Sequence, residues 1–128
     1  MSILILALFA HWFGDFVLQS DWMAINKSRS WSALAAHAAV VSAPLALVFA
    51  LAASGRYASS WDVIMSAALV GAAVNGAAHF AIDAVTSRIN ARLWAAEQRH
   101  WFFVCIGFDQ WLHVSLIIAT LAVLEARS

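Results

Sequence analysis

Charge is scarce in this sequence. Only 11% of its 128 residues are charged, and seven acidic side chains balance seven basic ones. Soluble domains carry about 25% charged residues, and domains that bind nucleic acid show a basic excess. The low charge content therefore argues against an ordinary soluble domain, and the even balance predicts that nucleic acid is not a partner.

Cysteine and proline are almost absent as well, with one residue of each. Cys105 alone excludes an internal disulfide and a multi-cysteine metal cluster, and in its apolar run a small packing residue is its ordinary role. Pro44 lies near the middle of an apolar run, where it removes one backbone hydrogen bond and favours a kink. The first apolar run has no basic n-region and no A-x-A cleavage site, so we predict a retained span rather than a signal peptide.

Hydrophobic residues dominate what remains. They make up 64% of the chain, and the mean hydropathy is +0.82. A chain this small has no interior large enough for so much apolar surface, so a lipid bilayer is the expected solvent. Four apolar runs, each about the roughly 20 residues needed to cross a membrane, are separated by short polar stretches. We predict one domain over residues 1–128, an all-α four-span transmembrane bundle with spans at about 3–19, 31–53, 61–85 and 101–124.

Histidine and aspartate recur at one spacing inside these apolar runs. Residues four apart share one face of a helix, and an ionisable group at bilayer depth costs at least a few kcal/mol. Three such pairs occur on three different predicted spans, His11/Asp15, His79/Asp83 and, in reverse order, Asp109/His113. We call the membrane side reached by the end of the first span side B. The three pairs and His37 all fall in the half of the membrane nearest side B, so we expect them to converge.

The converging set offers four imidazoles and three carboxylates. Mixed histidine and aspartate ligation suits a divalent transition metal, with zinc as the first candidate and manganese or iron as alternatives. The predicted metal ligands are His11, Asp15, His37, His79, Asp83, Asp109 and His113. Seven groups suit either two ions about 3.5–4 Å apart, or one ion with the other groups in an outer shell or acting as general base. The carboxylates Asp15, Asp83 and Asp109 are the candidate catalytic groups.

A metal would also offset the charge of buried carboxylates. A metal-activated hydroxide at headgroup depth is able to attack a phosphoester or other ester of a lipid, which predicts a metal-dependent hydrolase. Two other functions use the same residue types. One is a proton or cation channel or transporter, which would require a homo-oligomer to enclose the path. The other is a structural membrane protein in which the pairs fix helix packing; bis-histidine haem ligation is disfavoured by the interleaved aspartates.

Basic residues are distributed unevenly between the two membrane sides. Side B carries Lys27, Arg29, Arg88, Arg92 and Arg99, and the opposite side carries Arg56 and Arg127. By the positive-inside rule, side B is cytoplasmic and both termini lie outside, which predicts a multi-pass protein of the bacterial inner membrane with periplasmic termini. The two halves also resemble each other, since each has an H-x-x-x-D pair followed by a span with a histidine. This suggests two helical hairpins related by an axis along the membrane normal.

Three motifs carry a resemblance. The elements H-x-x-G-D…D-W at residues 11–22, H-x-x-x-D at 79–83 and D-Q-x-x-H at 109–113 resemble a family of small bacterial and phage membrane proteins known as a domain of unknown function, over nearly the whole chain. That family implies no activity. More distantly, the pattern is similar to inner-membrane proteins described as metal-dependent hydrolases, which implies a metal-ligand role for the same seven residues.

Overall fold

Helices account for nearly all of the chain that the structure describes. The computed structural model describes residues 2–57 and 60–126 and contains no strand within them. The helices are α1 (Ile3–Trp12), the π-helical turn η1 (Phe13–Val17), α2 (Asp21–Asn26), α3 (Trp31–Tyr57), α4 (Trp61–Ala95) and α5 (Arg99–Ala126). The predicted all-α class is therefore confirmed.

Within the described residues, three helical segments are long and apolar enough to cross a membrane. They are Trp31–Ser54, Trp61–Ala95 and Arg99–Leu124. The N-terminal apolar segment, Ile3–Val17, is shorter than the roughly 20 residues that a perpendicular span needs. A membrane protein with three candidate spans is thus supported, and the fourth span stays a prediction.

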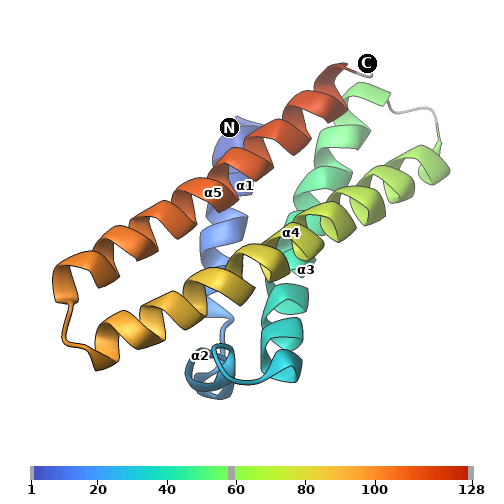
Figure 1. Ribbon diagram of the computed structural model, residues 1–128. Coiled ribbons are helices and arrows are strands. Elements are labelled where there is room, and N and C mark those ends of the chain that lie inside the picture. The colour runs from blue at the N-terminus through green and yellow to red at the C-terminus, as the bar shows by residue number, and fades with distance from the viewer. Residues whose placement is uncertain (1, 58–59, 127–128) are drawn as a thin grey trace.

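The long helices form two layers that cross each other. In Figure 1, α4 and α5 run side by side as an antiparallel hairpin, while α1 and α3 cross that hairpin at a steep angle. Helix α4 packs against both α3 and α5, and α1 packs against α3 and α5. The short helix α2 lies at the end of the bundle opposite the marked N-terminus. Side chains of α1, α3 and α5 meet α4 near its middle, where the rings of His11, His37 and His113 lie beside His79.

An apolar core fills one half of the bundle. Its buried members come from α1, α3 and α5, and are Ala7, Ala10, Val41, Leu45, Val48, Phe49, Ile117 and Leu121. Helix α4 approaches this core closely through Gly71, where an added Cβ would lie 2.7 Å from the Phe49 ring. Large apolar side chains such as Leu47 and Leu69 are exposed on the outer faces, as expected for helices that contact lipid.

The three long helices continue beyond the predicted spans. Helix α3 extends to Tyr57 rather than ending at residue 53, and α5 covers Arg99–Ala126 rather than 101–124. Helix α4 continues through residues 86–95, beyond the predicted end of its span at residue 85. The segment 86–95 has no proline or glycine and contains arginine, alanine and leucine, which are good helix formers. Helix α4 ends where Glu97 adopts a left-handed φ of 57°.

The predicted repeat and orientation are not decided by these helices. The hairpin that contains α1 is interrupted by η1 and α2, whereas α4 is continuous from end to end. Of the basic residues used for orientation, Arg127 and the side chain of Arg56 lie outside the part of the chain that the structure describes. Both the repeat and the cytoplasmic placement of side B remain predictions.

Candidate metal centre

The structure brings the seven predicted ligand residues together where the two layers cross. Each has 8% or less of its surface exposed, and they are His11, Asp15, His37, His79, Asp83, Asp109 and His113. The fifth histidine, His100, is exposed at the start of α5. The predicted convergence is therefore observed, and four of the five histidines belong to the cluster.

Asp15 reaches this cluster because of a local departure from α-helical geometry. It lies in η1, where the Leu18 backbone N–H donates to the Phe13 carbonyl oxygen at 2.9 Å. The neighbouring Gly14 packs directly on α3, since an added Cβ would lie 2.9 Å from Cα of Val41. π-Helical turns are rare and are frequent at functional sites. Together, the wider turn and the missing side chain place the Asp15 carboxylate beside α3.

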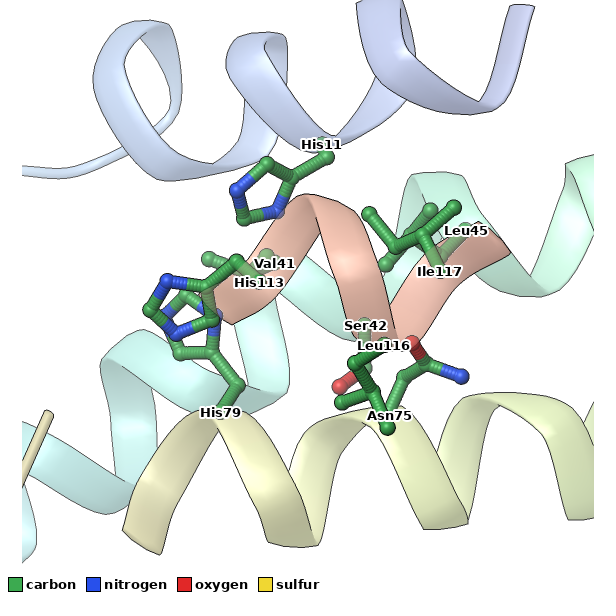
Figure 2. A pocket seen from close by; sticks show the side chains of 9 residues that line it. All are labelled: His11, Val41, Ser42, Leu45, Asn75, His79, His113, Leu116 and Ile117. Atoms are coloured by element: carbon green, nitrogen blue, oxygen red, sulfur yellow. The ribbon is translucent and has the colours of Figure 1, made fainter. Parts of the chain in front are cut away.

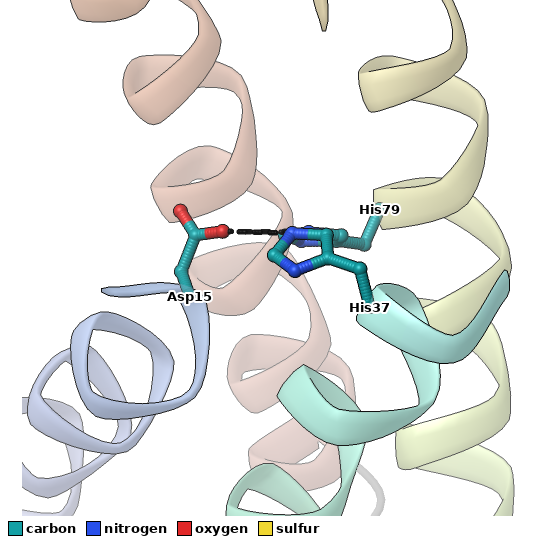
Figure 3. A group of neighbouring side chains, drawn as sticks. All are labelled: Asp15, His37 and His79. Carbon is teal, nitrogen blue, oxygen red and sulfur yellow. Dashed lines mark hydrogen bonds and ion pairs between the residues drawn. The ribbon is translucent and has the colours of Figure 1, made fainter. Parts of the chain in front are cut away.

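His37 lies at the centre of the shortest contacts. Its Nε2 is 3.1 Å from Oδ1 of Asp15, 3.2 Å from Oδ2 of Asp83, and 3.1 Å from Nε2 of His79. Nε2 of His79 is in turn 3.7 Å from Oδ1 of Asp15 and 3.6 Å from Oδ2 of Asp83. Figure 3 shows Asp15, His37 and His79 converging from three different elements. Two imidazole nitrogens and two carboxylate oxygens therefore face a common point.

Two overlapping groups of three residues have the spacing of a metal site. One consists of Asp15, His37 and His79, and the other of His79, Asp83 and His113. Within each group the ligand atoms all lie within 4.8 Å of one another, and every member is buried. Nitrogen and carboxylate oxygen ligands in this number fit zinc or another divalent transition metal. These five residues are the ones best placed to hold an ion.

Asp109 lies behind His113 rather than beside the common point. Its Oδ2 is 3.5 Å from Nδ1 of His113, and its Oδ1 accepts a hydrogen bond of 2.6 Å from the Thr86 hydroxyl. Nε2 of His113 faces Oδ1 of Asp83 at 3.9 Å. Histidines that bind metals commonly have a carboxylate at their second ring nitrogen. The position of Asp109 fits this supporting role, and among the described residues it belongs to neither ligand group.

His11 borders a small cavity next to the cluster. The cavity has a volume of about 10 Å³, and Figure 2 shows His11, His79 and His113 gathered along it, with Asn75 further along. Within the described residues, Nε2 of His11, Nε2 of His113 and Oδ1 of Asn75 are buried without a hydrogen-bond partner. Buried polar atoms are normally satisfied by protein or by water. The space fits about one water molecule, which these atoms would bind.

Asn75 makes its side-chain hydrogen bonds outside the cluster. Its side-chain amide donates to the Gly71 carbonyl oxygen and to the Thr120 hydroxyl, both at 2.9 Å. The second of these hydrogen bonds connects α4 to α5. Asn75 therefore fixes helix packing on the apolar side of the cavity, while its free carbonyl oxygen borders the cavity itself.

Two further polar side chains in the cluster were not predicted. Nζ of Lys27 donates to Oδ2 of Asp83 at 3.0 Å and lies 3.2 Å from Nε2 of His37. The Gln110 amide nitrogen donates to Oδ2 of Asp15 at 2.7 Å. Lys27 was assigned only to the basic surface of side B. Lys27 is the only lysine in the chain, but it has no histidine or aspartate at helical spacing within its own polar stretch that would have linked it to the cluster.

Comparison with known protein families identifies a match over nearly the whole chain. The family model described as "Protein of unknown function (DUF3307)" matches residues 3–128. The chain belongs to this family. The match confirms the resemblance to a domain of unknown function and covers every residue of the cluster, but it does not extend to the metal-dependent hydrolases. No curated protein and no solved structure matches the chain.

Proposed function

We propose that this protein is a multi-pass protein of the bacterial inner membrane that binds a divalent metal between its helices. Zinc is the first candidate, with manganese or iron as alternatives. The proposed activity is hydrolysis of a phosphoester or other ester of a lipid at the cytoplasmic leaflet. The observation that carries the proposal is the pair of overlapping ligand groups, which share His79; within each group the ligand atoms lie within 4.8 Å of one another.

The geometry favours a shared ion over hydrogen-bonded pairs that only fix packing. Packing pairs, whether within one helix or between two, would bring these groups together two at a time. The contacts within the three helical pairs are instead long, at 4.0 Å for His11 and Asp15, 3.6 Å for His79 and Asp83, and 3.5 Å for Asp109 and His113. The shortest contacts join different elements and meet at His37. Side chains that turn away from their helical partners toward one point fit a common ligand.

The chain's own residues then have distinct roles. Asp15, His37, His79, Asp83 and His113 would hold the ion, which would supply Lewis-acid activation of an ester and of water. Asp83 can serve both ligand groups, because its Oδ2 faces His37 while its Oδ1 faces His113. Asp109, itself held by Thr86, orients the His113 ring from behind. His11 borders the cavity that fits a water molecule.

The apolar core favours this function over a conducting pathway. A proton or cation path inside a single bundle would need polar groups or water through both of its halves. In the described chain, the half beyond the cluster is filled by buried apolar side chains, including Leu45, Phe49 and Leu121. The cavity beside the histidines has room for about one water molecule. Within one bundle, a site bordered on one side by apolar packing suits hydrolysis better than conduction.

A lipid-hydrolysis assay tests the catalytic part of the proposal. Purified protein would be reconstituted into vesicles with a panel of lipid phosphoesters and carboxylic esters, with and without a metal chelator. We expect turnover that the chelator abolishes and that Asp83→Asn reduces by about 10²-fold or more. His100→Ala, which changes the exposed histidine, is the matched control and should keep its activity. If metal-loaded protein left every lipid of the panel intact, the proposed hydrolase activity would be wrong.

A further inference from the structure

Lys27 places an ammonium group among the candidate metal ligands. It follows α2 directly, and its Nζ lies 3.0 Å from Oδ2 of Asp83 and 3.2 Å from Nε2 of His37. The Lys27 side chain is 20% exposed, whereas the side chains of Asp83 and His37 are 3% and 0% exposed. The ammonium therefore enters the cluster from its open side.

This ammonium and a divalent ion would require the same atoms. Oδ2 of Asp83 and Nε2 of His37 face the common point of the cluster, and both are in contact with Nζ of Lys27. An ion bound by these atoms would lie within a few ångströms of the ammonium, in a buried site where repulsion between like charges is strong. Lys27 in its present position therefore excludes the ion, and the bound ion would displace Lys27.

A displaced Lys27 would remain at the mouth of the site. It is held by the short turn between α2 and α3, where the Arg29 and Ser30 backbone N–H groups both donate to the Asn26 carbonyl oxygen. On α2, Trp22 and Ile25 expose 51% and 68% of their surfaces, as expected for a short helix at headgroup depth. The released ammonium would lie beside the side of the ion that has no protein ligand.

We propose that Lys27 is a displaceable internal cation which, once the metal has replaced it, forms a binding site for a phosphate oxyanion together with the ion. Before metal binding, the ammonium offsets the charge of the buried Asp83. After metal binding, it is available to a phosphate group, either of a lipid headgroup or of a free compound. An ammonium is a common point-charge ligand of phosphate. This inference rests on the metal centre proposed above, and it identifies the substrate class as a phosphoester.

Zinc affinity provides a direct test without an activity assay. Metal-free protein in detergent would be titrated with zinc in the presence and absence of methylphosphonate, a non-hydrolysable phosphate analogue. Without the analogue, we expect Lys27→Met to bind zinc about fivefold or more tightly than the wild type, because the competing cation is gone. The analogue should raise the zinc affinity of the wild type by about fivefold or more, and should leave that of Lys27→Met almost unchanged.

Arg29→Met is the matched control. It removes an exposed positive charge two residues away and should behave like the wild type in both titrations. Lys27→Gln is expected to reproduce Lys27→Met and serves in its place if the methionine variant does not fold. Vesicles of phosphatidylcholine with or without phosphatidic acid distinguish the two sources of phosphate. If the headgroup is the ligand, phosphatidic acid alone produces the Lys27-dependent gain; if only methylphosphonate does, the ligand is a free phosphate compound.

Two results would overturn the inference and leave the metal centre intact. One is a zinc affinity of Lys27→Met equal to or weaker than that of the wild type. The other is an equal effect of the phosphate analogue on both proteins. Failure of the wild type to bind zinc, manganese or iron would be a different result, because it would contradict the metal centre and this inference with it.

Discussion

A histidine that binds a metal through one ring nitrogen needs a partner for the other, and Asp109 supplies one for His113. Its carboxylate is fixed by the Thr86 hydroxyl at 2.6 Å and faces Nδ1 of His113 at 3.5 Å. We expect Asp109→Asn to weaken metal binding by about 10- to 100-fold without lowering the metal content at saturation. Metal titration of the purified variant measures both quantities.

The exposed Asp62, in the first turn of α4, provides the control for that experiment. Asp62→Asn removes the same charge far along the helix from the cluster and should bind metal as the wild type does. If Asp109→Asn lost stoichiometric metal even at saturation, Asp109 would be a direct ligand, as its spacing from His113 alone had suggested.

The sequence alone predicted the positions of some residues of the cluster but not of others. The seven buried groups were identified because helical spacing sets the face of each side chain, and the order of the spans sets its depth. Lys27 and Gln110 were not identified. The direction of Lys27 depends on the turn after α2, and Gln110 is polar with no paired residue at helical spacing. Neither position follows from a repeat in the sequence.

Among the helical elements, η1 has the largest effect on the site. Gly14 lets this turn lie against α3, where an added Cβ would come within 2.9 Å of backbone at Val41. We expect Gly14→Ala to lower the free energy of unfolding by about 1–3 kcal/mol, because two backbones must separate. It should also weaken metal binding, since Asp15 would move with the turn. Unfolding and metal titration in detergent test both effects.

Gly107 on α5 provides the comparison. An added Cβ there meets nothing within 4 Å, so Gly107→Ala should be neutral or stabilise the helix by up to about 1 kcal/mol. Equal stability of the two variants would contradict the close approach of η1 to α3.

Apolar runs predicted where the helices lie but not all of their limits. The apolar run of α4 ends near residue 85 because charged residues begin there, whereas the helix continues to Ala95 because nothing in that segment interrupts its backbone hydrogen bonds. The π-helical turn had no sequence signal apart from Gly14. It results from packing against α3, which a single segment does not encode.

For the whole molecule, the uneven basic charge predicts how the bundle sits in the membrane. We expect both termini outside and the turn between α4 and α5 in the cytoplasm. Single cysteines at Ser2 and Gln98, introduced into a Cys105→Ser background, can be probed in intact cells with an impermeant maleimide. Ser2→Cys should be labelled from outside, and Gln98→Cys only after the membrane is permeabilised. The reverse pattern would place the cluster near the outer leaflet.

The central claim is that the buried histidines and aspartates hold a metal, and elemental analysis of the purified protein tests it most directly. The structure predicts a stoichiometric divalent ion in the wild type and in His100→Ala, whose substitution lies outside the cluster. It predicts loss of that ion in His79→Ala and in Asp83→Ala. A metal-free wild type whose stability is unchanged by these two substitutions, or variants that keep as much metal as His100→Ala, would contradict the claim.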